Sequence, residues 1–266
     1  MNPYRCTFQM GMEKALEYRV NFILSLLSAV FPIIIQTFLW NYLYGNSDAA
    51  SMTGYSYSQI MVYTLLAAMV SHLVYTGFEY QVNQDIKNGG LNKYLVRPVN
   101  YRSYQFFSFL GEKAPQLLIL LAVAAALLVF SVFTLGLVLS LPRVLAFLTS
   151  LVLALVLNFF IFYCVALISF WLTDVNLLFG TVSVVLVVVS GGIFPMDIFG
   201  ERIAFLINLL PFGYTTQFPV NIINGRFGLY ETAVGFICQV FWIICFGMLG
   251  GLLWKRGLRR YTAVGG

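Results

Sequence analysis

A series of long apolar segments separated by short polar connections constrains this chain more than any other feature. A helix needs about 20 apolar residues to cross the roughly 30 Å hydrocarbon core of a bilayer. The sequence offers six candidate spans, of which the fifth is short: 20–44, 58–77, 114–138, 143–171, 177–190 and 231–254. Only 9% of the residues are charged, against about 25% in soluble domains. The pattern therefore predicts an all-α integral membrane protein, with one transmembrane domain over residues 1–266.

Two further stretches predict helices that do not cross the membrane. Residues 3–18 place Phe8, Met12, Ala15 and Leu16 at helical spacing, which predicts an amphipathic helix on the membrane surface. Residues 191–225 mix short apolar runs with prolines and glycines. Apolar runs of about 14 residues or fewer are typical of re-entrant or interfacial helices, so we expect such helices between the fifth and sixth spans.

The distribution of Lys and Arg predicts the orientation. Of the 15 Lys and Arg residues, all but Arg143, Arg202 and Arg226 lie near the chain ends or in the polar stretch 78–113. Cytoplasmic loops of membrane proteins carry an excess of Lys and Arg. We therefore expect both termini and 78–113 in the cytoplasm, and 191–225 outside. The cations form no surface stripe, so we expect membrane lipid rather than nucleic acid as a partner.

Residues able to carry catalysis are scarce. His72 is the single histidine, and the chain contains no His-Glu-x-x-His pattern for zinc. The four cysteines match neither a disulfide framework nor a zinc site. We expect no catalytic residue, metal or cofactor in this chain. It also contains no Gly-x-x-x-x-Gly-Lys-Ser/Thr phosphate loop, so any ATP-driven function must take its energy from another subunit.

Three polar side chains within the predicted spans, Gln36, His72 and Asn158, have two interpretations. Polar residues inside a membrane either line a passage or form hydrogen bonds between helices. The sequence leaves both open.

The polar stretch contains a compact turn. Gly89 and Gly90 supply the left-handed residue that commonly ends a helix, and Pro98 limits the short element after them. Leu91 and Leu95 lie one helical turn apart beside two cations, which predicts a knob for a cytosolic partner. The alternative is a solvated turn that only joins two spans.

Three runs of sequence carry a resemblance to a known family. They are Ile86-Lys87-Asn88-Gly89-Gly90-Leu91 to Leu95-x-Arg97-Pro98, then Ser190-Gly191-Gly192-Ile193-Phe194-Pro195-Met196, and then Leu209-Leu210-Pro211-Phe212-Gly213-Tyr214 followed by Pro219 and Asn224-Gly225. In this order, behind an N-terminal amphipathic helix, the chain resembles the six-span permease subunits of type-two ATP-binding-cassette (ABC) exporters, particularly small bacterial permeases. The resemblance covers nearly the whole chain.

This resemblance implies that 3–18 is a connecting helix and that 85–97 contains a coupling helix docking in a groove of an ATPase subunit. The implied contact residues are Asp85, Lys87, Leu91, Asn92, Lys93, Tyr94, Leu95 and Arg97. Residues 191–225 would contain extracellular re-entrant helices, with a gate region at Gly191, Gly192, Phe194, Pro195, Pro211, Phe212 and Tyr214. Two permeases, identical or homologous, would pair with two ATPases that hold ATP and Mg, in the bacterial inner membrane.

The few charges in the spans suit hydrophobic or amphiphilic cargo better than small ions. We therefore expect a permease subunit that exports such cargo by alternating access. The alternative function is a non-ATP-driven membrane channel or an assembly factor, for which 85–97 is only a loop.

Overall fold

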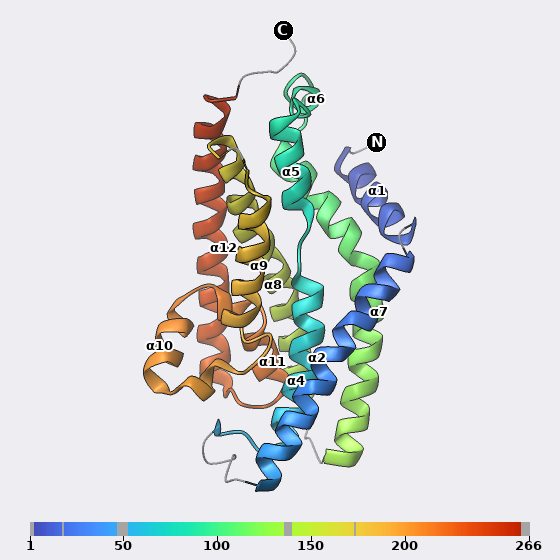
Figure 1. The fold of residues 1–266 in the computed structure, drawn as a ribbon, viewed down its shortest axis with the longest axis vertical. Helices are drawn as coiled ribbons and strands as arrows, with labels where there is room; N and C mark the ends of the chain where they lie inside the picture. Colours follow the sequence, from blue (N-terminus) through green and yellow to red (C-terminus); the bar gives the residue numbers. More distant parts are fainter. Residues whose placement is uncertain (1–2, 18, 47–52, 136–139, 173, 262–266) are drawn as a thin grey trace.

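The computed structural model describes residues 3–17, 19–46, 53–135, 140–172 and 174–261, and in these ranges all its regular elements are helices (Figure 1). The longer helices are α1 (Pro3–Glu17), α2 (Arg19–Asn46), α4 (Tyr57–Val74), α5 (Phe78–Lys87), α7 (Tyr101–Leu135), α8 (Leu141–Leu167), α9 (Asn176–Val189) and α12 (Leu229–Leu258). The short ones are α6 (Asn92–Leu95), η1 (Ile168–Phe170), η2 (Met196–Phe199), α10 (Glu201–Leu209), η3 (Phe212–Tyr214) and α11 (Gln217–Ile223). The predicted all-α fold is confirmed.

Three helical units in the described ranges are long and apolar enough to cross a membrane. They are Tyr57–Lys87, which joins α4 and α5, Leu141–Phe170, and Leu229–Leu258. The apolar window of the second is 67% buried inside the protein, whereas that of the third is only 11% buried. The α8 helix is therefore central, and α12 presents a large apolar surface outward, as expected for a surface that meets lipid.

An aromatic cluster around Phe159 of α8 holds the centre of the bundle together. Its ring lies 4.8 Å from that of Phe78 on α5, and 5.0 Å and 5.6 Å from those of Phe106 and Phe109 on α7. Tyr163, one turn further along α8, stacks on the same ring at 5.8 Å. Aromatic pairs at these separations add to the free energy gained by burial. The cluster thus fixes α5 and α7 against α8.

The N-terminal helix α1 packs along the first half of α7 (Figure 1). The two backbones approach closely at Gly11 and Gly111, where an added Cβ would overlap the carbonyl oxygens of Ser108 and Phe8. Nζ of Lys14 and Oε1 of Glu112 form an ion pair at 2.6 Å beside this crossing. The sequence predicted the helix but not this contact, which depends on two small residues in separate segments.

Most helices lie close to the predicted segments, but α7 does not. It begins at Tyr101, 13 residues before the predicted span 114–138, and that span stays a prediction. Residues 101–113 read as polar in sequence, yet their aromatic side chains pack on α8 and continue the helix. Residue 18 and residues 136–138 of the predicted segments lie outside the described ranges.

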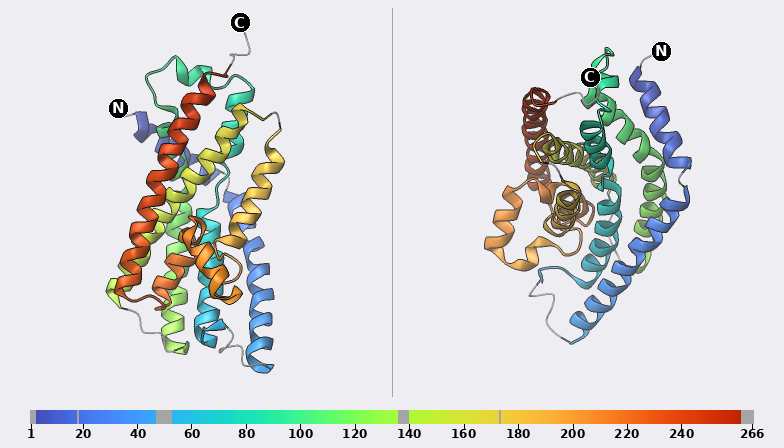
Figure 2. Two further views of the ribbon diagram at one scale, coloured as in Figure 1. Left: turned by 90° about the vertical axis from the view of Figure 1, so that its left-hand side faces the viewer. Right: turned by 45° about the horizontal axis from the view of Figure 1, so that its top comes forward.

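The long helices run between two ends of the bundle (Figures 1 and 2). One end, which we call the α6 end, carries α6, the end of α12 and the beginning of α1. The other, which we call the opposite end, carries the start of α4 and the end of α2. The α10 helix projects from the side of the bundle in the half nearer the opposite end.

Candidate functional site

The connection between α5 and α7, residues 88–100, begins with a tight turn at two glycines. Gly89 has φ of 73°, a left-handed conformation that favours glycine, as the sequence predicted. Gly90 passes so close to α5 that an added Cβ would lie 2.5 Å from Oδ1 of Asp85. The N–H of Leu91 then donates to the carbonyl oxygen of Asp85 at 3.0 Å. The connection therefore folds back on the last turns of α5.

The Asp85 side chain holds together the buried part of this connection, formed by Asp85, Leu91 and Tyr101, which we call the base. Its Oδ2 accepts a hydrogen bond from the hydroxyl of Tyr101 at 2.8 Å, and its Oδ1 lies 3.5 Å from Nζ of Lys93. The ring of Tyr101 stacks on that of Trp254 with centroids 5.1 Å apart, which ties the base to α12. Asp85 was predicted to contact a partner, but it is only 7% exposed and supports the connection from inside.

The outer surface of the connection is apolar and cationic. Val96 is 83% exposed and Leu95 is 47% exposed, with the exposed Lys93 and Arg97 on either side of them in sequence. We call Lys93, Leu95, Val96 and Arg97 the tip. Leu91 was expected to share an exposed knob with Leu95, but it is fully buried in the core cluster beneath α6.

Three other predicted contact residues are engaged within the chain. Nζ of Lys87 donates to the carbonyl oxygen of Leu172 at 2.5 Å, and Oδ1 of Asn92 accepts from the hydroxyl of Tyr261 at 3.1 Å. The ring of Tyr94 packs 4.9 Å from that of Tyr101. Val96 was not predicted, although its place between the predicted contact residues Leu95 and Arg97 was a signal for it.

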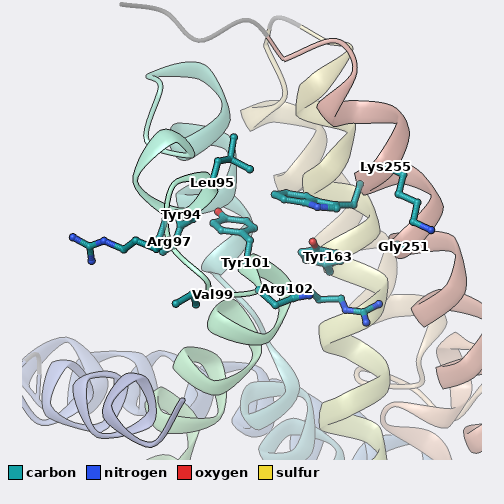
Figure 3. Close-up of a pocket in the computed structure, with 12 residues that line it drawn as sticks. Tyr94, Leu95, Arg97, Val99, Tyr101, Arg102, Tyr163, Gly251 and Lys255 are labelled. Atoms are coloured by element: carbon teal, nitrogen blue, oxygen red, sulfur yellow. The ribbon is translucent and has the colours of Figure 1, made fainter. Parts of the chain in front are cut away.

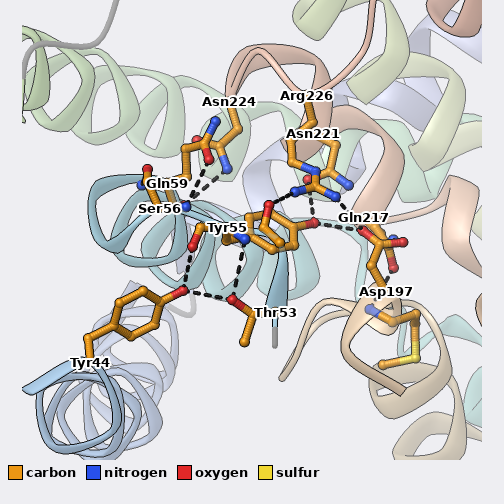
Figure 4. A network of polar contacts seen from close by, with 12 residues as sticks. Tyr44, Thr53, Tyr55, Ser56, Gln59, Asp197, Gln217, Asn221, Asn224 and Arg226 are labelled. Atoms are coloured by element: carbon orange, nitrogen blue, oxygen red, sulfur yellow. Dashed lines mark hydrogen bonds and ion pairs between the residues drawn. The ribbon is translucent and has the colours of Figure 1, made fainter. Parts of the chain in front are cut away.

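A polar network joins the loop before α4 to the predicted gate region (Figure 4). The hydroxyl of Tyr55 donates to Oδ2 of Asp197 at 2.8 Å and lies 3.2 Å from Oδ1 of Asn221. The guanidinium of Arg226 lies 3.8 Å from Oδ2 of Asp197 and 3.9 Å from the centroid of the Tyr55 ring. We call these four residues the clamp. Burial raises the pKa of the Tyr55 phenol, and the Asp197 carboxylate raises it further, so the hydroxyl keeps its proton.

Gln217 joins the clamp to the turn after α9. Its Nε2 donates to Oδ1 of Asp197 at 3.2 Å, and its Oε1 accepts from the N–H of Met196 at 3.1 Å. Gly191 has φ of 80°, and its carbonyl oxygen accepts from the hydroxyl of Tyr63 at 2.6 Å. The first part of the predicted gate region is therefore a fixed turn.

The remaining predicted gate residues pack in the same region. Gly192, Pro195 and Pro211 are buried, and Phe212 begins η3. The ring of Phe194 packs edge-on against that of Trp40, with the ring centroids 6.0 Å apart. The hydroxyl of Tyr214 donates to the carbonyl oxygen of Asn208 at 3.0 Å. The clamp residues themselves were not predicted. An acid and an arginine within otherwise apolar sequence were a signal for mutual pairing.

The three predicted pathway residues lie on three helices, Gln36 on α2, His72 on α4 and Asn158 on α8. Nδ2 of Asn158 donates to the carbonyl oxygen of Val74, so this side chain forms a hydrogen bond between helices. Gln36 is buried, and its Oε1 has no hydrogen-bond partner among the described residues. A role in lining a pathway stays a prediction for Gln36 and His72.

The candidate span Tyr57–Lys87 is interrupted where α4 ends at Val74 and α5 begins at Phe78. Figure 1 shows an extended link at this point. Non-helical backbone at membrane depth is tolerated where protein buries it. Glu79, in the first turn of α5, is 0% exposed, although the sequence placed it in a cytoplasmic stretch.

A comparison with known families matches residues 30–265 to the family described as ABC-2 family transporter protein. A comparison with curated proteins found no match. The matched range contains the connection, the clamp and the interrupted span, so all three belong to one permease unit. The chain belongs to the ABC-2 family of transporter proteins, which are membrane permeases of ABC transporters.

Proposed function

We propose that the chain is the permease subunit of an ATP-driven exporter and crosses the bacterial inner membrane six times. The six spans are α2, the α4–α5 unit, α7, α8, α9 and α12. The α6 end lies in the cytoplasm, because all but three of the 15 Lys and Arg residues fall on that side in this topology. Two such permeases, identical or homologous, associate with two ATPase subunits that bind ATP and Mg. The cargo is hydrophobic or amphiphilic, since only 9% of residues are charged.

The contrast between the base and the tip of the connection carries this proposal. The base is buried and bonded through Asp85 and Tyr101. The tip leaves Val96 83% exposed between the exposed Leu95 and Arg97. An exposed apolar patch with a charged rim is typical of a protein-binding surface. The tip therefore fits a groove of the ATPase that is apolar at its floor and acidic at its rim.

Two links transmit movement of the tip into the membrane. The Lys93–Asp85 ion pair and the Asp85–Tyr101 hydrogen bond join the tip to α7 through the base, and the Tyr101–Trp254 stack joins α7 to α12. The interruption after Val74 lets α5 tilt with the tip while α4 keeps its contacts with α2. Tilting of α5 at this interruption is the step that we assign to alternating access.

Copurification of an ATPase with the full-length tagged protein tests this proposal. The double variant Leu95→Asp with Arg97→Glu places repulsive charge at the tip, and we expect it to lower ATPase recovery by about tenfold or more. The matched control is Leu172→Asp. Leu172 is 46% exposed, against 47% for Leu95, and its carbonyl bond to Lys87 places it at the α6 end.

We expect the control to recover as much ATPase as the wild type. Equal recovery by the double variant would overturn the role of the tip. Wild-type protein that never retains an ATPase would favour the channel or the assembly factor.

A further inference from the structure

A cavity of about 330 Å³ lies between the connection and α12 at the α6 end (Figure 3). Tyr101, Tyr163 and Trp254 contribute aromatic rings to its lining. Arg102 and Lys255 also line it, and their side chains point in the same direction, toward the α12 side (Figure 3). The cavity is therefore aromatic inside and cationic along one edge.

An apolar groove adjoins this cavity along α12. Arg102, Gly251 and Lys255 line both the cavity and the groove, so these residues form the junction between them. The other groove residues are apolar, and include Phe160, Ile244 and Leu252. Nη1 of Arg102 donates to the carbonyl oxygen of Gly247 at 3.2 Å, which holds the guanidinium at the junction.

The charges at the junction have no acidic partner among the described residues. The ion pairs among the described residues join Lys14 to Glu112, Lys93 to Asp85 and Arg226 to Asp197. None of them involves Arg102 or Lys255. Arg97 also lines the cavity, but its guanidinium points away from it in Figure 3. An anion at the junction would thus meet two cations that are not neutralised by the described part of the chain.

Tyr163 supplies a second and independent observation. Its side chain is 0% exposed and lines the cavity, yet its hydroxyl has no hydrogen-bond partner among the described residues. A buried polar group without a partner destabilises the fold, so this hydroxyl needs an oxygen or nitrogen atom from elsewhere. A ligand with polar oxygens in the cavity would provide one.

We propose that the cavity and the groove together bind one anionic phospholipid from the leaflet at the α6 end. Its phosphate lies between Arg102 and Lys255, its polar headgroup reaches toward Tyr163, and an acyl chain follows the groove along α12. Basic pockets between membrane helices bind anionic headgroups, and Trp and Tyr concentrate at this depth of the bilayer. A soluble phosphate would leave the groove empty, and the adjoining apolar groove therefore favours a lipid.

Native mass spectrometry of the full-length protein in detergent tests this site. The protein is incubated with dioleoylphosphatidylglycerol or dioleoylphosphatidylcholine, which share acyl chains and differ in headgroup charge. We expect about tenfold higher retention of the anionic lipid, and loss of that preference in Arg102→Gln with Lys255→Gln. Arg256→Gln is the matched control, because Arg256 neighbours Lys255 and lines neither the cavity nor the groove.

A steric variant gives a second readout without a change in charge. An added Cβ at Gly251 would contact only Nη1 of Arg102, at 3.9 Å, so a leucine side chain at this position starts without overlap and extends into the junction. We expect Gly251→Leu to lose the anionic lipid as well. An excess of glycerol 1-phosphate distinguishes a lipid from a soluble phosphate, because it lacks acyl chains and should not displace the bound lipid.

Equal retention of the two lipids by the wild type would overturn the site. So would equal loss in Arg256→Gln, lipid retention by Gly251→Leu, or full displacement by glycerol 1-phosphate. The experiment needs no ATPase, so its failure would leave the proposed function untouched.

Discussion

The tip and the clamp use polar side chains in opposite ways. In the clamp, Tyr55, Asp197 and Arg226 contact one another, and they join the loop before α4 to the region between α9 and α12. At the tip, Leu95 and Val96 project outward while the bonds that hold the connection lie beneath them. The polar groups of the clamp therefore stabilise the fold, whereas the side chains of the tip remain exposed and able to bind a partner.

This difference predicts that substitutions at the two regions separate stability from function. Changes in the clamp should lower the thermal stability of the isolated chain. Changes at the tip should leave stability intact and weaken ATPase binding. Asp85 lies between these cases, because it is buried like the clamp but supports the tip.

The largest loss of stability should follow Asp197→Ala. This change removes the acceptor for Tyr55 and Gln217 and the ion-pair partner of Arg226. We expect the free energy of unfolding to fall by about 2–3 kcal/mol, because three groups lose their partner in a partly buried site. Thermal unfolding in detergent, followed by tryptophan fluorescence, measures the change. The exposed Glu13→Ala is the control, and equal melting of both variants would refute the clamp.

Asp85→Ala should lower both stability and ATPase recovery. The buried hydroxyl of Tyr101 loses its acceptor, and we expect a cost of about 1–3 kcal/mol. Asp85→Asn keeps an acceptor for Tyr101 and should recover much of the stability. The same melting assay, paired with copurification, separates the two effects. If ATPase recovery stayed at the wild-type level in Asp85→Ala, the base would not be needed to present the tip.

Tyr55→Phe should have a smaller effect than Asp197→Ala. It removes one hydroxyl and keeps the ring beneath the guanidinium of Arg226. We expect a loss of about 1 kcal/mol, the usual net value of one hydrogen bond. A loss as large as that of Asp197→Ala in the melting assay would mean that the hydroxyl, and not the carboxylate, organises the clamp.

Val96→Ala should change stability least. Its side chain is 83% exposed, so we expect the free energy of unfolding to stay within about 0.5 kcal/mol of the wild type. ATPase recovery should nevertheless decrease, because the tip loses apolar contact area. If Val96→Ala lowered the free energy of unfolding and left ATPase recovery unchanged, Val96 would stabilise the fold rather than bind the ATPase.

Local sequence pattern predicted the helices and the turn at Gly89, because apolar run length and glycine conformation depend on neighbouring residues. It could not predict which distant side chains meet. Tyr55 and Asp197 are 142 residues apart, and the Gly11–Gly111 crossing also joins separate segments. Hydropathy likewise gave no sign that α7 begins as early as Tyr101, because residues 101–113 pack through aromatic side chains rather than through an apolar run.

A photoreactive cross-linking residue placed at Val96 tests the central claim most directly. Val96 is 83% exposed at the tip, and Leu172, 46% exposed at the same end, provides the comparison position. In the native host, we predict a cross-link from position 96 to a polypeptide that carries the Gly-x-x-x-x-Gly-Lys-Ser/Thr loop, and none from position 172. Cross-links from position 96 only to lipid, or to the ATPase equally from both positions, would contradict the assignment of the tip as the coupling surface.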